Sequence, residues 1–237
     1  MPYLYETHLH TSPVSRCAKA SVEESVAYYK SLGYAGVFIT NHFISTTDIA
    51  QVDLDEYRKS IEYYCSDYEE GARLGEQMGI SVFFGIEMSY HTAHFLVYGL
   101  DPAWLLSHPE IVTIPMPDKL AFLKDAGALV IHAHPYRDWG EKSFLRLFPH
   151  HVHGVEMVNT SQSPFVNEMG KIYTKGYGLL PFAGSDNHAA HRKRVLGGMM
   201  SERPIESVAD FVSAVKSGEM TPFINNVDEN ELLPLTL

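Results

Sequence analysis

Cysteine is scarce in this sequence, since Cys17 and Cys65 are the only two among 237 residues. Two cysteines cannot form the disulfide framework that holds small secreted domains together. They are compatible with a reducing compartment, and we expect the protein to be cytoplasmic. The length exceeds what one small module needs and suits one α/β domain, so we predict a single domain over residues 1–237.

Long apolar runs and positive charge are also in short supply. No uninterrupted apolar stretch approaches the roughly 18 residues of a membrane helix, and the first residues lack the basic start and apolar core of a signal peptide. The 18 Lys and Arg stand against 29 Asp and Glu, a formal net charge of −11 that repels a phosphate backbone. We therefore expect neither membrane binding nor stable nucleic-acid binding. The basic run at residues 191–194 could form an anion-attracting rim or simply a solvated face.

Helices and strands are expected to alternate along the chain. Ser21 and Glu24 form a capping-box pattern before a helical apolar spacing, and Gly33 stands where that helix would end. The expected helices lie at residues 22–32, 53–77, 118–125, 164–175 and 205–217. The expected strands lie at 35–40, 80–86, 95–100, 128–133, 154–158 and 179–183. Residues 107–117, with three prolines, indicate a loop. This alternation predicts an α/β fold with a parallel sheet, open or closed into a barrel.

Histidine, by contrast, is abundant, and many of the 13 histidines stand where the predicted strands end. In a β/α barrel, side chains at the carboxyl ends of the strands converge on one face. Imidazole and carboxylate groups together suit Zn, Mn or Fe, so the pattern predicts a metal site. The strand-end residues are His8, His10, His42, Glu87, His94, His132, His134, Asp186 and His188.

Two pairs have the spacing of ligands that share one ion. His8 and His10 are two residues apart, so on a strand both side chains point to the same side. Asp186 and His188 have the same spacing after an apolar run, where a carboxylate that nothing neutralises would be costly. The alternatives are two histidines near a chain end for the first pair and turn chemistry for the second. The other strand-end histidines favour the metal interpretation of both pairs.

Glu87 and His134 extend the candidate centre. Glu87 follows an apolar strand and can use both oxygens, so it is the candidate to bridge two ions, the alternative being a salt-bridged surface acid. His132 and His134 share a face; we assign the ligand role to His134 and leave His132 as a supporting or core residue. Arg137 could reach the same mouth as an anion clamp or form a surface ion pair. The histidines expected in surface or turn positions are His108, His150, His151, His153 and His191.

Five short motifs occur in a fixed order along the chain. They are His8-x-His10-Thr11, Ile39-Thr40-Asn41-His42, Gly85-Ile86-Glu87 with His94, Ala133-His134-Pro135-Tyr136-Arg137, and Gly184-Ser185-Asp186-Asn187-His188. Taken in this order, they resemble the signature of the PHP (polymerase and histidinol phosphatase) family of metal-dependent phosphoesterases. The resemblance covers most of the chain, and five ordered motifs are far more specific than any one of them.

The resemblance implies a fold and a ligand set. The fold would be a distorted, TIM-like barrel of about seven β/α units, and the centre would hold two or three divalent ions, Zn, Mn or Fe. Carried over position by position, the implied ligands are His8, His10, Glu87 and Asp186 for the first ion, Glu87, His94 and His134 for the second, and His42 and His188 for a third.

Two departures from the family pattern affect the third site. Family members commonly have an Asp or His shortly after the first motif, but residues 11–17 contain neither. The usual Thr-Asp-His becomes Thr40-Asn41-His42, which removes a carboxylate next to that ligand. Cys17 could substitute as a soft ligand, or the third ion could be weakly bound or missing.

The function implied is hydrolysis of a small phosphomonoester by a hydroxide that bridges the ions. Arg137 and Arg16 would position the phosphate, Glu87 would bridge, and His42 or His188 would protonate the leaving oxygen. Histidinol phosphate, a nucleotide and a sugar phosphate all fit as substrates. Open alternatives are a phosphodiesterase, an amidohydrolase-type hydrolase, and a non-catalytic metal-stabilised regulatory module. A homo-oligomer is equally compatible with the sequence.

Overall fold

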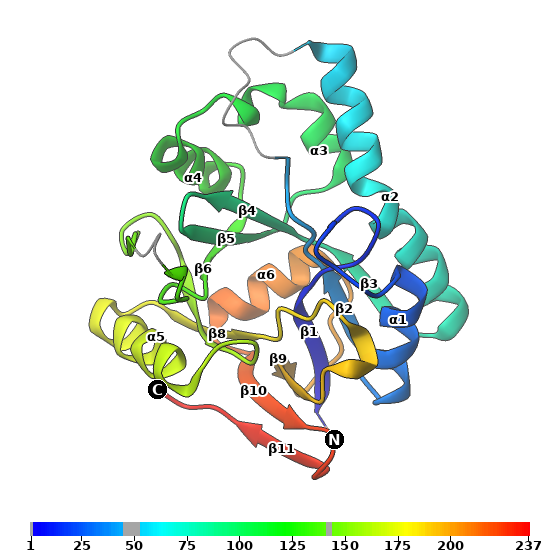
Figure 1. Cartoon of the computed structure of the whole chain (residues 1–237), viewed down its shortest axis with the longest axis vertical. Coiled ribbons are helices and arrows are strands. Elements are labelled where there is room, and N and C mark those ends of the chain that lie inside the picture. Colours follow the sequence, from blue (N-terminus) through cyan, green and yellow to red (C-terminus); the bar gives the residue numbers. More distant parts are fainter. Residues whose placement is uncertain (1, 45–52, 141–143) are drawn as a thin grey trace.

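The computed structural model describes residues 2–44, 53–140 and 144–237 (Figure 1). Its described residues form two β-sheets with helices packed on their outer faces and one helix, α6 (Val208–Ser217), between them. The mixed α/β class expected from the sequence is confirmed. Among the described helices, none is both long and apolar enough to cross a membrane.

The first sheet contains the start and the end of the chain. Its strand order is β11-β10-β9-β1-β2-β3, in which β1, β2 and β3 run parallel while β9, β10 and β11 pair antiparallel. The bounds are Tyr3–Leu9 for β1, Gly36–Ile39 for β2, Ser81–Phe84 for β3, Val195–Ser201 for β9, Thr221–Asn226 for β10 and Glu231–Pro234 for β11. The last three strands were not expected from the sequence.

The second sheet has the order β4-β5-β6-β7-β8. Its bounds are Ile86–Tyr90 for β4, Ala93–Tyr98 for β5, Leu129–Ala133 for β6, Gly154–Asn159 for β7 and Leu180–Gly184 for β8. The pairs β4–β5 and β5–β6 are antiparallel, and β6–β7 and β7–β8 are parallel. The expected all-parallel sheet is therefore wrong, because a tight turn between β4 and β5 returns the chain directly and leaves no room for a crossover helix.

The two sheets approach each other at two seams. Gly85 separates β3 from β4, so the single strand expected at 80–86 is divided between the sheets. A side chain at Gly85 would meet Thr40 Cγ2 at 2.7 Å, which explains why glycine stands at this junction. Isolated bridges pair His42 with Glu87 and Leu9 with Asn187. In the described part of the chain, the strand ladders do not close into one continuous barrel.

The interior between the sheets is aromatic. Phe38 of β2, Tyr98 of β5 and Phe182 of β8 are fully buried and pack around Phe211 of α6. The Tyr98 hydroxyl donates to the carbonyl of Thr7 at 2.7 Å, which ties β5 to β1 across this core. The core thus holds the carboxyl ends of strands from both sheets at fixed positions.

The helices follow the capping signals. Helix α1 (Val22–Ser31) begins with the predicted capping box of Ser21 and Glu24, and α2 (Leu54–Met78) ends at Gly79 in the left-handed conformation. The loop expected at 107–117 is wrong: it holds the end of α3 (Pro102–Ser107), the 3₁₀ helix η1 (Pro109–Val112) and the start of α4 (Met116–Asp125). Proline is tolerated in the first turn of a helix, and here it begins helices rather than excluding them. The described part of the chain also contains α5 (Pro164–Tyr177) and the 3₁₀ helix η3 (Ala190–Arg192).

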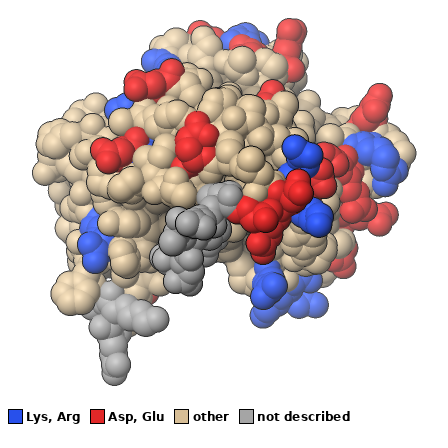
Figure 2. Space-filling model, turned by 90° about the horizontal axis from the view of Figure 1, so that it is seen from above, with Lys and Arg blue, Asp and Glu red and all other residues tan. Residues whose placement is uncertain are grey.

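The surface carries charges of both signs. Figure 2 shows acidic and basic side chains interspersed over the face seen from above. Within the basic run 191–194, Arg194 pairs with Asp228 at 2.9 Å, and Lys193 donates to Ser161 Oγ at 2.7 Å. Ser161 in turn donates to the carbonyl of Asp186 at 3.2 Å, so one residue of this run reaches the edge of the strand-end cluster.

Candidate metal centre

Eight predicted site residues lie together at the strand ends. They come from the ends of β1, β2, β6 and β8 or the residues just after them, and from β4 and β5 directly. Four groups of three have ligand atoms within 4.8 Å of one another. The groups are His8, His134 and Asp186; His8, His10 and Glu87; His42, Glu87 and His94; and His10, His42 and His188.

Glu87 lies at the middle of the cluster and is 1% exposed. Five imidazole nitrogens lie within 3.3 Å of its two carboxylate oxygens. They belong to His8, His10, His42, His94 and His134. From the sequence, the alternative for Glu87 was an acid in a surface ion pair. That alternative is excluded, because the carboxylate is buried among histidines.

Asp186 supplies the second carboxylate. Its Oδ1 lies 3.5 Å from His8 Nε2, 3.3 Å from His10 Nε2 and 3.4 Å from His188 Nδ1. The backbone φ of Asp186 is +50° and that of His134 is +27°, values that residues other than glycine rarely adopt. Strained backbone persists where the surroundings fix it, and such positions cluster at functional sites.

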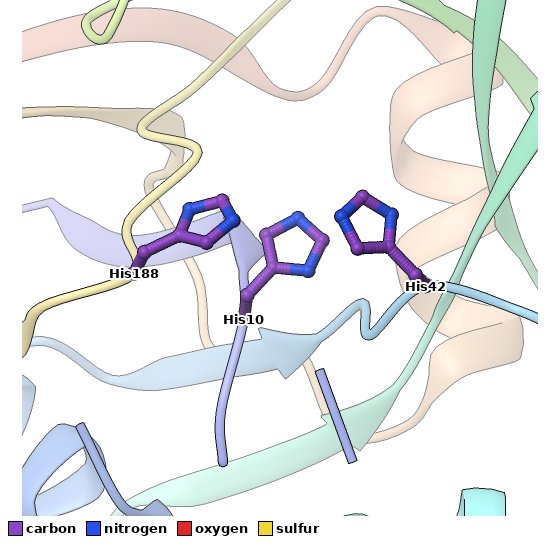
Figure 3. A group of neighbouring side chains, drawn as sticks. All are labelled: His10, His42 and His188. Atoms are coloured by element: carbon purple, nitrogen blue, oxygen red, sulfur yellow. The ribbon is translucent and has the colours of Figure 1, made fainter. Parts of the chain in front are cut away.

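Three histidines, His10, His42 and His188, lie side by side at the most open part of the cluster, and Figure 3 shows the arrangement of their rings. The ring of His10 lies between the other two, with centroid distances of 4.4 Å to His42 and 4.3 Å to His188. The side chains of His42 and His188 are 33% and 27% exposed, whereas His10 is fully buried. This edge therefore faces the solvent from which a substrate would arrive.

The geometry fits divalent metal ions. Glu87 Oε2 and His42 Nδ1 are 2.6 Å apart, yet neither atom has a hydrogen bond of acceptable geometry to any described group. A carboxylate oxygen and an imidazole nitrogen this close, neither with a hydrogen bond of acceptable geometry, are arranged as ligands that share an ion. Imidazole nitrogens and carboxylate oxygens are the donors that Zn, Mn and Fe accept.

The charges of the cluster are mutually dependent. Burial raises the pKa of Glu87, but the neighbouring His94 and His8 more than offset this and hold it well below its usual range. Burial lowers the pKa of His10 to about 3. Burial also lowers the pKa of His42, while contacts with Cys17 and Glu87 more than offset this and raise it to about 10. Ligands bind metal in the deprotonated form, so metal binding at His42 would release a proton.

Two buried glutamates support the cluster, and the sequence analysis missed both. Glu156 Oε1 lies 2.8 Å from His8 Nδ1, and its Oε2 accepts from the His134 amide at 3.0 Å. Glu6 accepts from the amides of His8 and Ser185 at 2.9 and 3.1 Å. Each lies among apolar residues of a strand, where a buried carboxylate needs hydrogen bonds or an opposite charge. This placement is the sequence feature from which both glutamates could have been identified.

Arg137 and Arg16 differ in position. Arg137 lies 3.6 Å from Asp186 Oδ2, and its guanidinium lies 4.4 Å from the ring centroid of Trp139. The ring of Trp139 is 5.1 Å from that of His94, so Trp139 is a further neighbour of the cluster that the sequence analysis did not identify. Arg16 is exposed and lines a pocket beside His42.

The other polar residues considered from the sequence fall outside the four groups. His132 is fully buried, and neither of its ring nitrogens has a hydrogen-bond partner among the described residues, so it is a core residue. Cys17 is exposed, and the histidines His188 and His42 more than offset partial burial and lower its pKa to about 6. Cys17 therefore lies next to the open edge, where the sequence analysis considered it as a soft ligand of a third ion. The histidines that are exposed or half-buried away from the cluster are His108, His150, His151, His153 and His191.

Comparison with known proteins returns similar folds rather than similar sequences. No family model and no curated protein matches the chain. A two-domain structure from Bacteroides vulgatus, described as containing a predicted PHP-like metal-dependent phosphoesterase, superposes with a TM-score of 0.65 at 15% identity. The alignment covers 94% of this chain but 64% of that protein, so this chain spans less than two thirds of its length.

Two further structures match over most of both chains. One, from Bifidobacterium adolescentis and described as a metal-dependent phosphoesterase, has a TM-score of 0.55 at 15% identity and covers 80% of this chain and 90% of that one. The other is an amidohydrolase from Chromobacterium violaceum with bound sulfate and no metal, with a TM-score of 0.55 at 14% identity and coverage of 89% and 96%. The resemblance noted in the motifs is confirmed at the level of structure: the chain has the fold of PHP-like metal-dependent phosphoesterases.

Proposed function

We propose that this protein is a metal-dependent hydrolase that cleaves small phosphomonoesters. The observation that carries the proposal is Glu87, a buried carboxylate with five imidazole nitrogens within 3.3 Å. Burying this many charged and polar groups costs free energy unless an ion compensates them. Metal-dependent hydrolysis is the chemistry that such a cluster suits. The fold shared with metal-dependent phosphoesterases supports the same reading.

The proposed ligand sets are those that the motif resemblance implies, and only the set with His10, His42 and His188 coincides with one of the four groups described above. His8, His10, Glu87 and Asp186 would hold one ion, and Glu87, His94 and His134 a second. His42 and His188, with His10 between them, would hold a third. Zn, Mn and Fe are the candidate ions, since all accept this mixture of donors.

The chain's own residues would then bind and orient the phosphate. Bound divalent ions would supply an activated water and neutralise charge on the phosphoryl oxygens. Arg137, held between Asp186 and Trp139, is positioned to pair with a phosphate oxygen. Where no third ion is bound, His42 or His188 at the open edge would donate a proton to the leaving oxygen.

Three broader assignments accompany this proposal. The two sheets would form the halves of a distorted (β/α)7 barrel, a view supported by the single bridges His42–Glu87 and Leu9–Asn187 at the seams. The partner would be a small phosphorylated metabolite rather than nucleic acid or a membrane, consistent with the net charge of −11. The cytoplasm is the proposed location.

The test is hydrolysis of 4-nitrophenyl phosphate by protein stripped with chelator and reconstituted separately with Mn²⁺, Zn²⁺ and Fe²⁺. We expect release that requires metal and falls by at least about a thousandfold in Glu87→Gln, together with a loss of bound metal. The matched control is Glu110→Gln, an exposed glutamate, which should keep full activity. Metal binding without hydrolysis of any phosphoester would overturn the proposal.

A second candidate, C–N bond hydrolysis, rests on the amidohydrolase from Chromobacterium violaceum that shares the fold. Clustered histidines and carboxylates also suit that reaction. Adding aryl amides to the same assay separates the two, because only one substrate class should respond to the metal and to Glu87→Gln. A protein that binds metal and turns over neither class would be a metal-stabilised regulatory module.

A further inference from the structure

A pocket of about 730 Å³ adjoins the open edge of the metal centre. It lies between the segment after β1, the segment after β2 and one face of helix α2. Its walls are mainly apolar and aromatic, and the principal lining residues are Val14, Cys17, Phe43, Ile44, Tyr63 and Tyr64. Segments that follow the carboxyl ends of strands determine substrate choice in β/α folds, so the pocket has the location of a specificity site.

Two residues connect the pocket to the metal centre. His42 lines the pocket, and its Nδ1 lies 2.6 Å from Glu87 Oε2. Ser15 also lines the pocket; its hydroxyl lies 3.2 Å from His10 Nδ1 and accepts from the His42 amide at 3.1 Å. A molecule in the pocket would therefore lie against His42, which is itself a proposed ligand.

The aromatic walls are held in place by hydrogen bonds to the backbone. The Tyr64 hydroxyl donates to the carbonyl of Asn41 at 2.9 Å, and the Tyr63 hydroxyl donates to the carbonyl of Pro13 at 3.2 Å. Phe43 packs on Tyr64 with ring centroids 5.3 Å apart. Pockets of this size, largely preformed and apolar with a few polar groups, are typical of small-molecule sites.

The two sides of the centre differ in what they offer a substrate. Arg137 contacts the side at Asp186, where it would pair with phosphate. The pocket adjoins the other side, at His42 and Glu87, and among its described lining residues the exposed Arg16 is the only Lys, Arg, Asp or Glu. A compact polar leaving group, such as a sugar, would leave these apolar walls uncovered.

We infer that this pocket binds the leaving group of the phosphoester and selects an uncharged organic group that carries an aromatic ring. The inference rests on the proposed function, because it assumes that the phosphate lies at the metal centre. It narrows the substrate from phosphomonoesters in general to those whose leaving alcohol is apolar and ring-bearing. An aromatic ring has the shape and polarity to lie among Phe43, Tyr63 and Tyr64.

The test compares benzyl phosphate with methyl phosphate, whose leaving alcohols are similarly basic. In Ser60→Trp the new indole enters the pocket from α2, because Ser60 is among its lining residues. We expect the ratio of kcat/KM for benzyl over methyl phosphate to fall by at least about tenfold. Glu62→Trp, an exposed position on the same helix outside the pocket lining, should leave the ratio within about twofold of wild type. An unchanged ratio in Ser60→Trp would overturn the inference.

A second variant keeps the test informative if Ser60→Trp folds poorly. Tyr63→Ala removes a wall whose side chain is 55% exposed, and should lower the same ratio without filling the pocket. We expect a decrease of about three- to tenfold, carried by KM for benzyl phosphate. Equal losses for both esters would mean that Tyr63 has only a structural role and would count against the inference.

A binding measurement separates the inference from the proposed function. Cys17 lines the pocket and is exposed, whereas Cys65 is buried, so a thiol reagent on the metal-loaded native protein reports on Cys17. Benzylphosphonate should slow this labelling at least about fivefold more than methylphosphonate does. Selective protection without hydrolysis of any ester would keep the pocket and reject the phosphoesterase. Hydrolysis of both esters without selectivity, and without protection of Cys17, would support the phosphoesterase and overturn the inference about the pocket.

Discussion

His8 Nδ1 lies 2.8 Å from Glu156 Oε1, and both side chains are buried. A histidine that donates one ring N–H to a carboxylate has the other nitrogen free for a metal, with its orientation fixed. The free nitrogen here is Nε2, which faces Glu87 at 3.3 Å and Asp186 at 3.5 Å. Glu156 therefore determines which nitrogen of His8 faces the cluster.

The first prediction concerns Glu156→Gln. The amide cannot accept from both His8 and the His134 amide as the carboxylate does, so His8 loses its fixed orientation. We expect metal affinity to fall by about 10–100-fold, measured by competition with a chromogenic chelator. Glu168→Gln, an exposed glutamate on α5, is the matched control. Unchanged affinity in Glu156→Gln would show that His8 needs no such partner.

The second prediction concerns His132, whose buried nitrogens have no partner among the described residues. His132→Phe removes the unpaired polar atoms and keeps a planar ring next to Phe95, at present 5.2 Å away by ring centroids. We expect the free energy of unfolding at pH 7 to rise by about 1 kcal/mol. His108→Phe is the control. His108 Nδ1 lies 2.8 Å from the carbonyl of Trp104, and because Phe loses that contact, this variant should not gain stability.

The same variant has an expected pH dependence. Burial lowers the pKa of His132 to about 3, below the value of about 6.5 for an unfolded chain. The unfolded state therefore binds a proton first, and the wild type loses stability as the pH falls from about 6.5 toward 3. His132→Phe cannot lose stability by this route, so its advantage in urea unfolding should be larger at pH 5 than at pH 7.5. A constant difference would contradict the pKa assignment.

The third prediction uses two glycines with opposite surroundings. A Cβ at Gly198 of β9 would lie 2.1 Å from the carbonyl oxygen of Tyr5, a backbone atom that cannot move without disturbing β1. We expect Gly198→Ala to cost about 3 kcal/mol or more in thermal unfolding. A Cβ at Gly176 in helix α5 would meet nothing within 4 Å, so Gly176→Ala should stabilise by about 0.5–1 kcal/mol. Equal effects at both positions would contradict the close packing of β9 on β1.

Some of this architecture can be predicted from the sequence because its causes are local. The capping box of Ser21 and Glu24 depends on four consecutive residues, and helix α1 begins where it stands. The strand-end histidines were visible because imidazoles rarely follow several apolar runs in one chain without a function. The structure brings His8 of β1, Glu87 of β4 and Asp186 of the segment after β8 together, as the order of the motifs implied.

Other features depend on distant partners and have weak local signals. Strands β9 and β10 pair through glycines at 197 and 198, which reduce strand propensity in the sequence although the sheet requires their small size. The division of one apolar run at Gly85 follows from the approach of Thr40, which is distant in sequence. Glu156 was hidden because a single acid in a strand gives no indication of the histidine it will contact.

The fourth prediction uses Trp139 as a reporter of metal binding. Its ring lies 5.1 Å from that of His94 and 6.4 Å from that of His134, two of the proposed ligands of one ion. The other tryptophan, Trp104, stacks on His108 and is not near any of the four ligand groups. In Trp104→Phe, all tryptophan fluorescence therefore comes from Trp139.

Titrating Zn²⁺ into chelator-stripped Trp104→Phe should change the fluorescence until the site with His94 and His134 is filled, because ligation fixes the rings that the indole contacts. Glu87 Oε1 lies 2.9 Å from His94 and 3.3 Å from His134. Adding Glu87→Gln to this background replaces the carboxylate by a neutral amide with a single acceptor oxygen, and the change should then require much higher Zn²⁺. The change should also be absent in Trp139→Phe, which retains only Trp104. A response that persists unaltered in the Glu87→Gln background would place the ion away from Glu87 and argue against a carboxylate shared between two ions.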